Sequence, residues 1–266
     1  MRDNEITEIS QISEELLCKY LHACHILHYH DLLDAYGHIS VRLSPSTFLM
    51  CRYLAPALAA STDDLVVYKV EDGEAVAADA PRGFSERFIH SEIYKAYPET
   101  QSVLHSHSLD VVPFSISSTP LQACFHRAGF LGTAVPVWDV ATVYREYPDY
   151  LQDMKVTDTR LGLDLAKSLG SAVNGQPTHP VVLMRGHGFV ATSDSLEMTV
   201  LRGVYTTQNA KVQMAAVGLG EQIQFMTERE GKSTGKTGVV KPWPLWVREV
   251  EENPLYRNDL SKQNRP

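Results

Sequence analysis

Ser102-Val103-Leu104-His105-Ser106-His107-Ser108 is a short apolar run that ends in two histidines two residues apart. The side-chain period of a β-strand is two, so the imidazoles of His105 and His107 are expected on the same face of a strand. Such a pair can offer two nitrogens to one metal ion or one substrate without distortion of the chain. The stretch therefore predicts a strand that carries part of a site, with a third imidazole and a carboxylate supplied from elsewhere.

The composition is that of a globular protein with a substantial core. The chain has 266 residues, of which 44% are hydrophobic and 21% charged. This length suits one large α/β domain or two small ones, and no linker is long enough to divide the chain. We therefore predict a single domain over residues 1–230, followed by a C-terminal tail over residues 231–266 that packs on the domain or on a neighbouring subunit.

The charge pattern argues against two classes of partner, and the cysteines indicate a reducing compartment. The formal net charge is −8, with acids and bases mixed along the chain, which argues against nucleic acid or an anionic membrane as the partner. No apolar window approaches the roughly 18 residues that a membrane helix needs, and residues 1–5 do not resemble a secretory signal. We expect a cytoplasmic protein that acts on a small molecule and keeps its cysteines as free thiols, at Cys18, Cys24, Cys51 and Cys124.

Hydrophobic periodicity predicts an alternation of helices and strands. We expect a helix over residues 11–34, with Ser10 or Ser13 as its N-cap and Gly37 after its end. Strands are expected over residues 38–42, 48–53, 63–70, 103–108, 134–137, 180–185 and 189–191. Further helices are expected over residues 86–97, capped by Ser85, over 161–169, and from Asp194 as N-cap to about residue 218, with Glu197 completing a capping box.

The first predicted helix is rich in histidine, at His22, His25, His28 and His30. The first two lie one turn apart and could pair on a ligand. No carboxylate or cysteine nearby completes a ligand set, so we interpret these histidines as ordinary polar or half-buried helix positions.

Three other positions could complete the site begun by the histidine pair. His187 stands between two glycines after a buried strand, an arrangement that leaves its imidazole open to a ligand. His38 lies at a helix-to-strand corner, where ligand-binding groups often occur. Glu86 can be explained as an acid in the first turn of a helix, so its role needs outside support. Three histidines and an open position are a common arrangement for a catalytic divalent metal, although spacing alone leaves a structural role equally open.

Four short motifs in this order resemble the class II aldolase/adducin family. They are Gly37-His38-Ile39-Ser40, Ser85-Glu86 with His90 one turn later, His105-Ser106-His107, and Arg185-Gly186-His187-Gly188. The resemblance extends from about residue 10 to about residue 217. It implies an α/β fold, a three-layer α/β/α domain with a central, mostly antiparallel sheet, and a homotetramer with sites near subunit interfaces.

The resemblance also implies the roles of the site residues. His105, His107 and His187 would bind a divalent metal, and Glu86 would be the acid/base carboxylate beside it. The metal would polarise a carbonyl or enolate oxygen while Glu86 moves the proton. Zinc is the first choice of metal, but Mn²⁺, Fe²⁺ and Co²⁺ also suit three imidazoles.

Departures from the family pattern bear on the substrate. Sugar-phosphate aldolases of this family have an asparagine where this chain has His38, and a Thr-Gly or Ser-Gly pair where it has Leu54-Ala55-Pro56-Ala57-Leu58. Alanine and proline offer no hydroxyl, and proline has no N–H to hold a phosphate. The variant resembles a branch that includes decarboxylases of hydroxylated aromatic acids. There His38, His126, Arg127 and Arg52 could contact carboxylate or phenol oxygens, with structural ion pairs as the alternative for both arginines.

The leading hypothesis is a divalent-metal-dependent lyase that cleaves a C–C bond of a non-phosphorylated hydroxy, keto or hydroxyaromatic carboxylate. Decarboxylation is favoured over retro-aldol cleavage, with Glu86 or His38 protonating carbon. The alternatives are a non-haem iron oxygenase that uses the same three histidines, and a non-enzymatic interaction domain of the adducin type. The adducin branch lacks the metal ligands, and this chain keeps them, which favours an enzyme.

Overall fold

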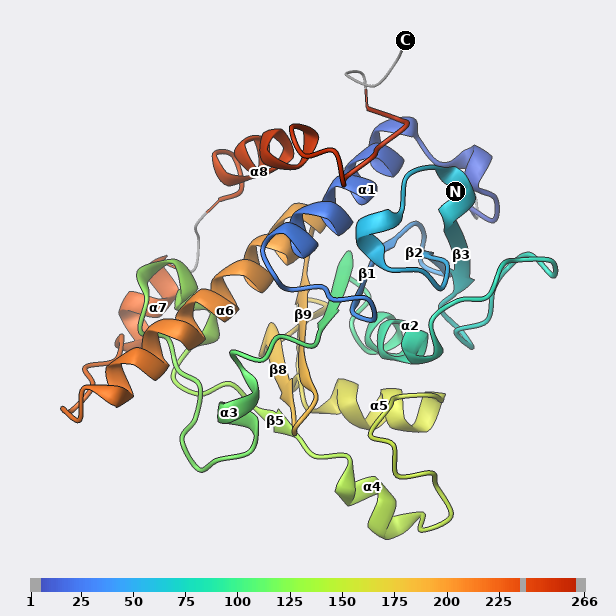
Figure 1. Ribbon diagram of the computed structural model, residues 1–266. Helices are drawn as coiled ribbons and strands as arrows, with labels where there is room; N and C mark the ends of the chain where they lie inside the picture. The colour runs from blue at the N-terminus through green and yellow to red at the C-terminus, as the bar shows by residue number, and fades with distance from the viewer. Residues whose placement is uncertain (1–5, 235–237, 262–266) are drawn as a thin grey trace.

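In a computed structural model, which describes residues 6–234 and 238–261, a seven-stranded sheet lies between two layers of helices (Figure 1). The strand order is β3-β2-β1-β4-β9-β8-β5, and all neighbours are antiparallel except β5 and β8. The predicted three-layer α/β/α fold with a mostly antiparallel sheet is thereby confirmed. The strands are β1 (His38–Arg42), β2 (Thr47–Cys51), β3 (Leu65–Lys69), β4 (Ser102–Ser106), β5 (Val137–Trp138), β8 (Val181–Met184) and β9 (Gly188–Ser193), with β6 (Ala172–Val173) and β7 (Gln176–Pro177) forming a separate hairpin.

The two longest helices, α1 (Glu14–Tyr29) and α6 (Leu196–Gly218), run side by side on one face of the sheet (Figure 1). The opposite layer contains α2 (Phe88–Ala96) and α5 (Thr159–Lys167), which pack on each other. The remaining helices are α3 (Val112–Ser115), α4 (Ala141–Glu146), α7 (Glu228–Thr234) and α8 (Pro242–Glu251). No helix among the described residues is long and apolar enough to cross a membrane.

Close packing of α6 on the central strand fixes the layer spacing. A Cβ on Gly203 of α6 would lie 2.6 Å from Leu104 Cδ2 and 2.7 Å from Leu32 Cδ2, so a larger residue would require these leucine side chains to shift. Since successive strand residues face opposite ways, Leu104 faces α6 while the neighbouring His105 faces the α2 layer. The apolar packing on one face of β4 therefore directs the histidine to the other.

The first helix ends earlier than predicted. It stops at Tyr29 rather than near residue 34, and Asp31 adopts a positive φ of 60°. The N–H groups of Leu32 and Leu33 both donate to the carbonyl of Leu27, which closes a turn. The two leucines are buried in the core, and because Leu32 continues the helical spacing of apolar residues in the sequence, the pattern predicted a longer helix. The N-cap is Ser13, one of the two predicted candidates.

Two predicted N-caps are wrong. Ser195, not Asp194, caps α6, because its Oγ accepts a hydrogen bond from the Met198 N–H at 3.3 Å. Ser85 caps no α-helix; residues Ser85–Arg87 form a separate 3₁₀ turn before α2 begins at Phe88. Glu86 has non-helical dihedrals (φ −91°, ψ 19°), so it is not an acid in the first turn of α2. An interaction with the helix dipole of α2 therefore does not explain this residue.

The described part of the C-terminal segment contacts α1. Asn258 Nδ2 donates to the Cys18 carbonyl at 3.0 Å, and the Tyr256 hydroxyl lies 2.8 Å from His28 Nδ1. His22 Nε2 lies 3.4 Å from Glu251 of α8. Residues 1–5, 235–237 and 262–266, which include part of the predicted tail, lie outside the described residues. All four cysteines are free thiols.

Gly188, the first residue of β9, allows this strand to approach β4 closely. Its φ is +153°, a conformation that residues with a side chain rarely adopt. A Cβ at this position would overlap the carbonyl oxygen of Ser106 and lie 3.0 Å from His107 Cα. The glycine predicted to free the loop around His187 therefore also sets the position of His107.

We predict that Gly188→Ala lowers the free energy of unfolding by about 2 kcal/mol, because both the backbone strain and the overlap with Ser106 must be relieved by moving a strand. Urea denaturation followed by circular dichroism measures the change. The matched control is Gly218→Ala, where nothing lies within 4 Å of the new Cβ, and stability should be unchanged or slightly raised. Equal stability of the two variants would contradict this account.

Candidate active site

The strand register places His38 and His105 together. They are directly paired across β1 and β4, so both imidazoles face the α2 layer, with ring centroids 5.1 Å apart. Both side chains are buried, at 2% and 0% exposure. The Nδ1 of His105 lies 3.3 Å from the carbonyl oxygen of Phe189 on the neighbouring strand β9.

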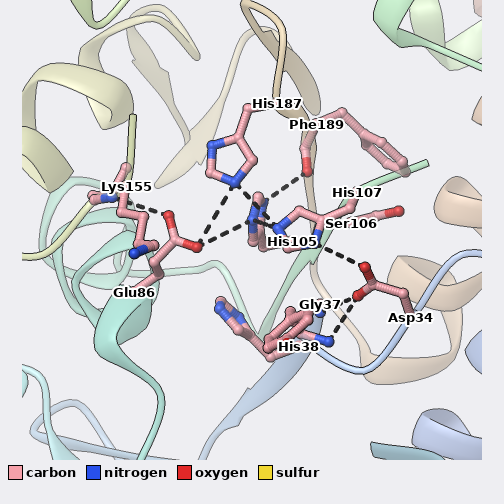
Figure 2. Close-up of polar contacts among 12 residues, drawn as sticks. Asp34, Gly37, His38, Glu86, His105, Ser106, His107, Lys155, His187 and Phe189 are labelled. Carbon is pink, nitrogen blue, oxygen red and sulfur yellow. Dashed lines mark hydrogen bonds and ion pairs between the residues drawn. The ribbon is translucent and has the colours of Figure 1, made fainter. Parts of the chain in front are cut away.

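His107 and His187 complete a cluster of three imidazoles (Figure 2). His107 follows the end of β4, and His187 lies in the tight turn between β8 and β9, where Gly186 has a φ of +64°. The Nε2 of His107 is 3.0 Å from Nε2 of His105 and 3.1 Å from Nε2 of His187. The end of one strand and one turn thus bring together three nitrogens separated by up to 82 residues.

Glu86 faces this cluster from the 3₁₀ turn before α2 (Figure 2). Its Oε2 lies 3.7 Å from His105 Nε2 and 3.8 Å from His187 Nε2, while its Oε1 accepts the Val156 N–H at 2.9 Å. Ligand atoms of the four residues all lie within 4.8 Å of one another. Among residues 6–234 and 238–261, this is the one group of three or more such side chains with that spacing.

The hydrogen bonds around the imidazoles show that this donor set fits a divalent cation. The Phe189 carbonyl and the Asp34 carboxylate can only accept, so Nδ1 of His105 and Nδ1 of His107 carry the protons, each at 3.3 Å. The Nε2 atoms of both rings are then unprotonated and face each other at 3.0 Å, where their lone pairs repel. Zinc at about 2.0–2.1 Å from each nitrogen, in tetrahedral geometry, would hold the nitrogens about 3.3 Å apart, close to the observed spacing.

Burial controls the charge states of the site. It lowers the pKa of His105 well below its usual value, and neighbouring imidazoles add to the effect. It lowers the pKa of His187 to about 4, so both rings are neutral and able to bind a metal. Burial raises the pKa of Glu86, against the opposing hydrogen bond from Val156 and the nearby His107, which favours a carboxyl group that can carry a proton.

A cavity of about 690 Å³ opens beside the cluster. Its walls combine aromatic rings with two cationic side chains, Arg82 and Lys155. The Arg82 guanidinium lies 4.4 Å from the centroid of the Tyr53 ring, and Lys155 pairs with Asp153 at 3.0 Å. The aromatic walls and the histidines that reach the cavity are Tyr36, Tyr53, Phe84, His38, His107 and His187.

Three predicted substrate-binding residues do not line this cavity. Arg52 forms an ion pair with Asp64, its Nη2 2.9 Å and its Nε 3.0 Å from Oδ1, which is the structural alternative for this arginine. His126 and Arg127 lie in the 3₁₀ helix His126–Leu131, which packs against α6 and α7. The structure does not bring them to the cluster, and their role in substrate binding stays a prediction.

The sequence reasoning missed Asp34, Arg82 and Lys155. The turn role of Asp34 could have been predicted, because aspartate is common at the start of turns. Its Oδ1 accepts the N–H groups of Tyr36 at 2.7 Å and Gly37 at 2.8 Å. Its second oxygen reaches His107, which only the fold could show. Arg82 and Lys155 stand in irregular loops, where no periodic pattern indicates which side chains face inward.

We predict that Asp34→Asn weakens zinc binding about 10–100-fold. The amide oxygen can keep both turn hydrogen bonds, but the amide nitrogen would then face the Nδ1–H of His107 and disturb its tautomer. Competition with a chromophoric zinc chelator measures the affinity. Asp63→Asn, at an exposed position, is the control, and an Asp34→Asn affinity equal to that of the control would contradict the role given to Asp34.

Comparison with known proteins identifies the family of this chain. Residues 18–214 match the family described as "Class II Aldolase and Adducin N-terminal domain". The decarboxylase tropJ of Talaromyces stipitatus is 45% identical over 256 residues, which cover 90% of this chain and 95% of that protein. A 3,4-dihydroxyphthalate decarboxylase of Rhodococcus jostii is 24% identical over 236 residues, covering 86% of this chain and 91% of the relative.

Solved structures share the fold. An aldolase II superfamily protein from Pseudomonas syringae superposes with a TM-score of 0.72 at 20% identity, covering 94% of this chain and 99% of that one. The L-fuculose 1-phosphate aldolase from Glaciozyma antarctica gives a TM-score of 0.69 at 19% identity, covering 97% of both chains. The chain therefore belongs to the class II aldolase/adducin family, on a branch with decarboxylase relatives, and it is a carbon–carbon lyase.

Proposed function

We propose that this protein is a divalent-metal-dependent decarboxylase of a non-phosphorylated hydroxyaromatic carboxylate. The observation that carries the proposal is the convergence of three imidazole Nε2 atoms beside a buried carboxyl group, at the wall of a cavity lined by aromatic rings and charged side chains. The names of the two curated relatives support decarboxylation over aldol cleavage.

His105, His107 and His187 would hold the metal, and zinc is our first choice because it favours three imidazoles with one open position. Mn²⁺, Fe²⁺ and Co²⁺ accept the same ligands. When bound, a divalent ion supplies Lewis-acid polarisation of a substrate oxygen. Asp34 and the Phe189 carbonyl keep two of the imidazoles in the tautomer that binding requires.

The cavity walls suit a flat, anionic substrate. Phe84 packs 4.8 Å from the His38 ring and 5.7 Å from the Tyr53 ring, measured between centroids, which leaves aromatic faces for a substrate ring. Arg82 adds positive charge for a carboxylate or phenolate, while the charge of Lys155 is paired with Asp153, which also lines the cavity. The stretch from Leu54 to Leu58 adds no hydroxyl group that could hold a phosphate.

Glu86 would supply the proton that replaces the carboxyl group. When the C–C bond breaks, its electron pair stays on the ring carbon and carbon dioxide leaves. The protonated Glu86 then gives its proton to that carbon, and solvent restores the acid. The Val156 N–H holds Oε1, so Oε2 is the oxygen directed at the histidine cluster.

We also propose a homotetramer, as the family resemblance implies. Support comes from apolar side chains that remain exposed on the C-terminal half of α6 and beyond it, at Val212, Val217 and Leu219, with exposed fractions from 45% to 78%. Contiguous exposed apolar residues are typical of subunit interfaces.

We predict that the purified protein releases carbon dioxide from dihydroxybenzoates or dihydroxyphthalates and does not cleave sugar phosphates. Chelator should abolish turnover, and His107→Ala should remove it because a ligand nitrogen is lost. His179→Ala, at an exposed histidine outside the cavity, is the control and should retain activity. Turnover that survives chelator or His107→Ala would contradict a metal role, and oxygen consumption with bound iron would favour the oxygenase alternative.

We predict that Glu86→Gln lowers kcat about 10²–10⁴-fold, since an amide cannot deliver a proton. Zinc affinity should stay near that of the wild type because the three imidazoles are unchanged. Carbon dioxide release and chelator competition, measured on the same sample, separate the two effects. The exposed Glu71→Gln is the control, and a loss of zinc rather than of kcat would show that Glu86 is a metal ligand instead.

A further inference from the structure

A series of buried polar side chains extends from His38 away from the cavity. His38 Nδ1 lies 2.7 Å from His90 Nε2, and His90 Nδ1 lies 2.6 Å from Ser40 Oγ. The Ser40 hydroxyl in turn lies 2.7 Å from the Tyr94 hydroxyl. These short distances link four side chains from β1 and α2 into one continuous series.

Every member of the series is shielded from water. Ser40 and His90 are 0% exposed, Tyr94 1% and His38 2%. Burial lowers the pKa of His90 to about 3, so its ring is neutral and has one donor and one acceptor. A buried donor without an acceptor is destabilising, so the direction of the hydrogen bonds is set by which arrangement satisfies every group.

The terminal tyrosine determines that direction. Within the described part of the chain, Ser40 is the one side chain that forms a hydrogen bond with the Tyr94 hydroxyl. If Ser40 donated to Tyr94, the phenol proton would have no acceptor, so Tyr94 donates to Ser40.

The remaining bonds follow from this first one. Ser40 accepts from Tyr94 and donates its own proton to Nδ1 of His90. His90 must then carry its proton on Nε2 and donate it to Nδ1 of His38. His38 consequently carries its single proton on Nε2, the nitrogen left for the cavity that His38 lines.

We propose that Tyr94, Ser40 and His90 are positioning residues that lock His38 in the Nε2–H tautomer, so that His38 is a fixed hydrogen-bond donor to an anionic oxygen of the substrate. The inference rests on the proposed function for the identity of that oxygen, a carboxylate or phenolate. A fixed donor favours an oxygen that only accepts. The fixed donor at His38 Nε2 therefore distinguishes such a substrate from one that directs a hydroxyl proton at this nitrogen.

The assignment separates the two candidate proton donors. A neutral imidazole that gave up its only N–H proton would be left as an anion in a buried site, which is costly. His38 therefore binds and orients the substrate, while Glu86 remains the group that delivers a proton to carbon. The sequence had left these two residues as alternatives for the same step.

Neutron diffraction from crystals of the perdeuterated protein tests the tautomer directly and needs no substrate or activity. We expect deuterons on Nε2 of His38 and Nε2 of His90, and none on their Nδ1 atoms. A deuteron on His38 Nδ1 directed at His90 would overturn the proposal. The test is independent of the proposed function, because the tautomer can be observed even if no hydroxyaromatic carboxylate is decarboxylated.

Ser40→Ala tests the consequence for substrate binding. Loss of the hydroxyl removes the bias toward one tautomer, so KM should rise about 10-fold, as expected for one hydrogen bond, while zinc affinity stays unchanged. Ser40→Thr keeps the hydroxyl and should restore KM. Ser193→Ala, a buried serine on β9 outside the series, is the matched control. An unchanged KM in Ser40→Ala, or an equal rise in Ser193→Ala, would overturn the positioning role.

Discussion

The repulsion between two imidazole nitrogens, Nε2 of His105 and Nε2 of His107, is the constraint on which this site depends. Nε2 of His107 lies 3.0–3.1 Å from its two neighbours, and acceptors on the far side of His105 and His107 hold the protons on Nδ1. The neutral rings of His105 and His107 cannot satisfy each other in this arrangement, and burial opposes protonation of His105. A cation resolves the conflict, so the surrounding fold has to maintain an arrangement that is unfavourable without a cation.

The sheet maintains this arrangement of imidazoles through close backbone contacts. β4 supplies His105 and leads directly to His107, β1 pairs with it to place His38, and the β8–β9 turn presents His187. Gly188 allows β9 to approach the end of β4, and the layer of α1 and α6 holds the opposite face through apolar packing. The histidines are thus positioned by strand ends, and the aromatic and cationic groups that line the cavity come from loops, where side chains can change without loss of the fold.

Much of this organisation could be predicted from the sequence, because period-two patterns and glycine-flanked turns are local. The strands and the position of His187 between two glycines follow from such signals, whereas the fold class was implied by the resemblance of four short motifs to a known family. Local signals did not predict the end of α1, the cap of α6 or the 3₁₀ turn at Glu86. At these places neighbouring residues have similar propensities to begin or end a helix, and tertiary packing decides among them. The contacts of Asp34, Arg82 and Lys155 depend on distant segments, and no local pattern encodes them.

The central claim is that the three Nε2 atoms hold one divalent ion. Anomalous diffraction at the zinc edge, from crystals grown with equimolar zinc and no chelator, tests it most directly. The account predicts one anomalous peak at about 2.0–2.1 Å from Nε2 of His105, His107 and His187, with an open position toward the cavity. Absence of a peak at this point, or a zinc ion bound elsewhere with the three imidazoles left free, would contradict it.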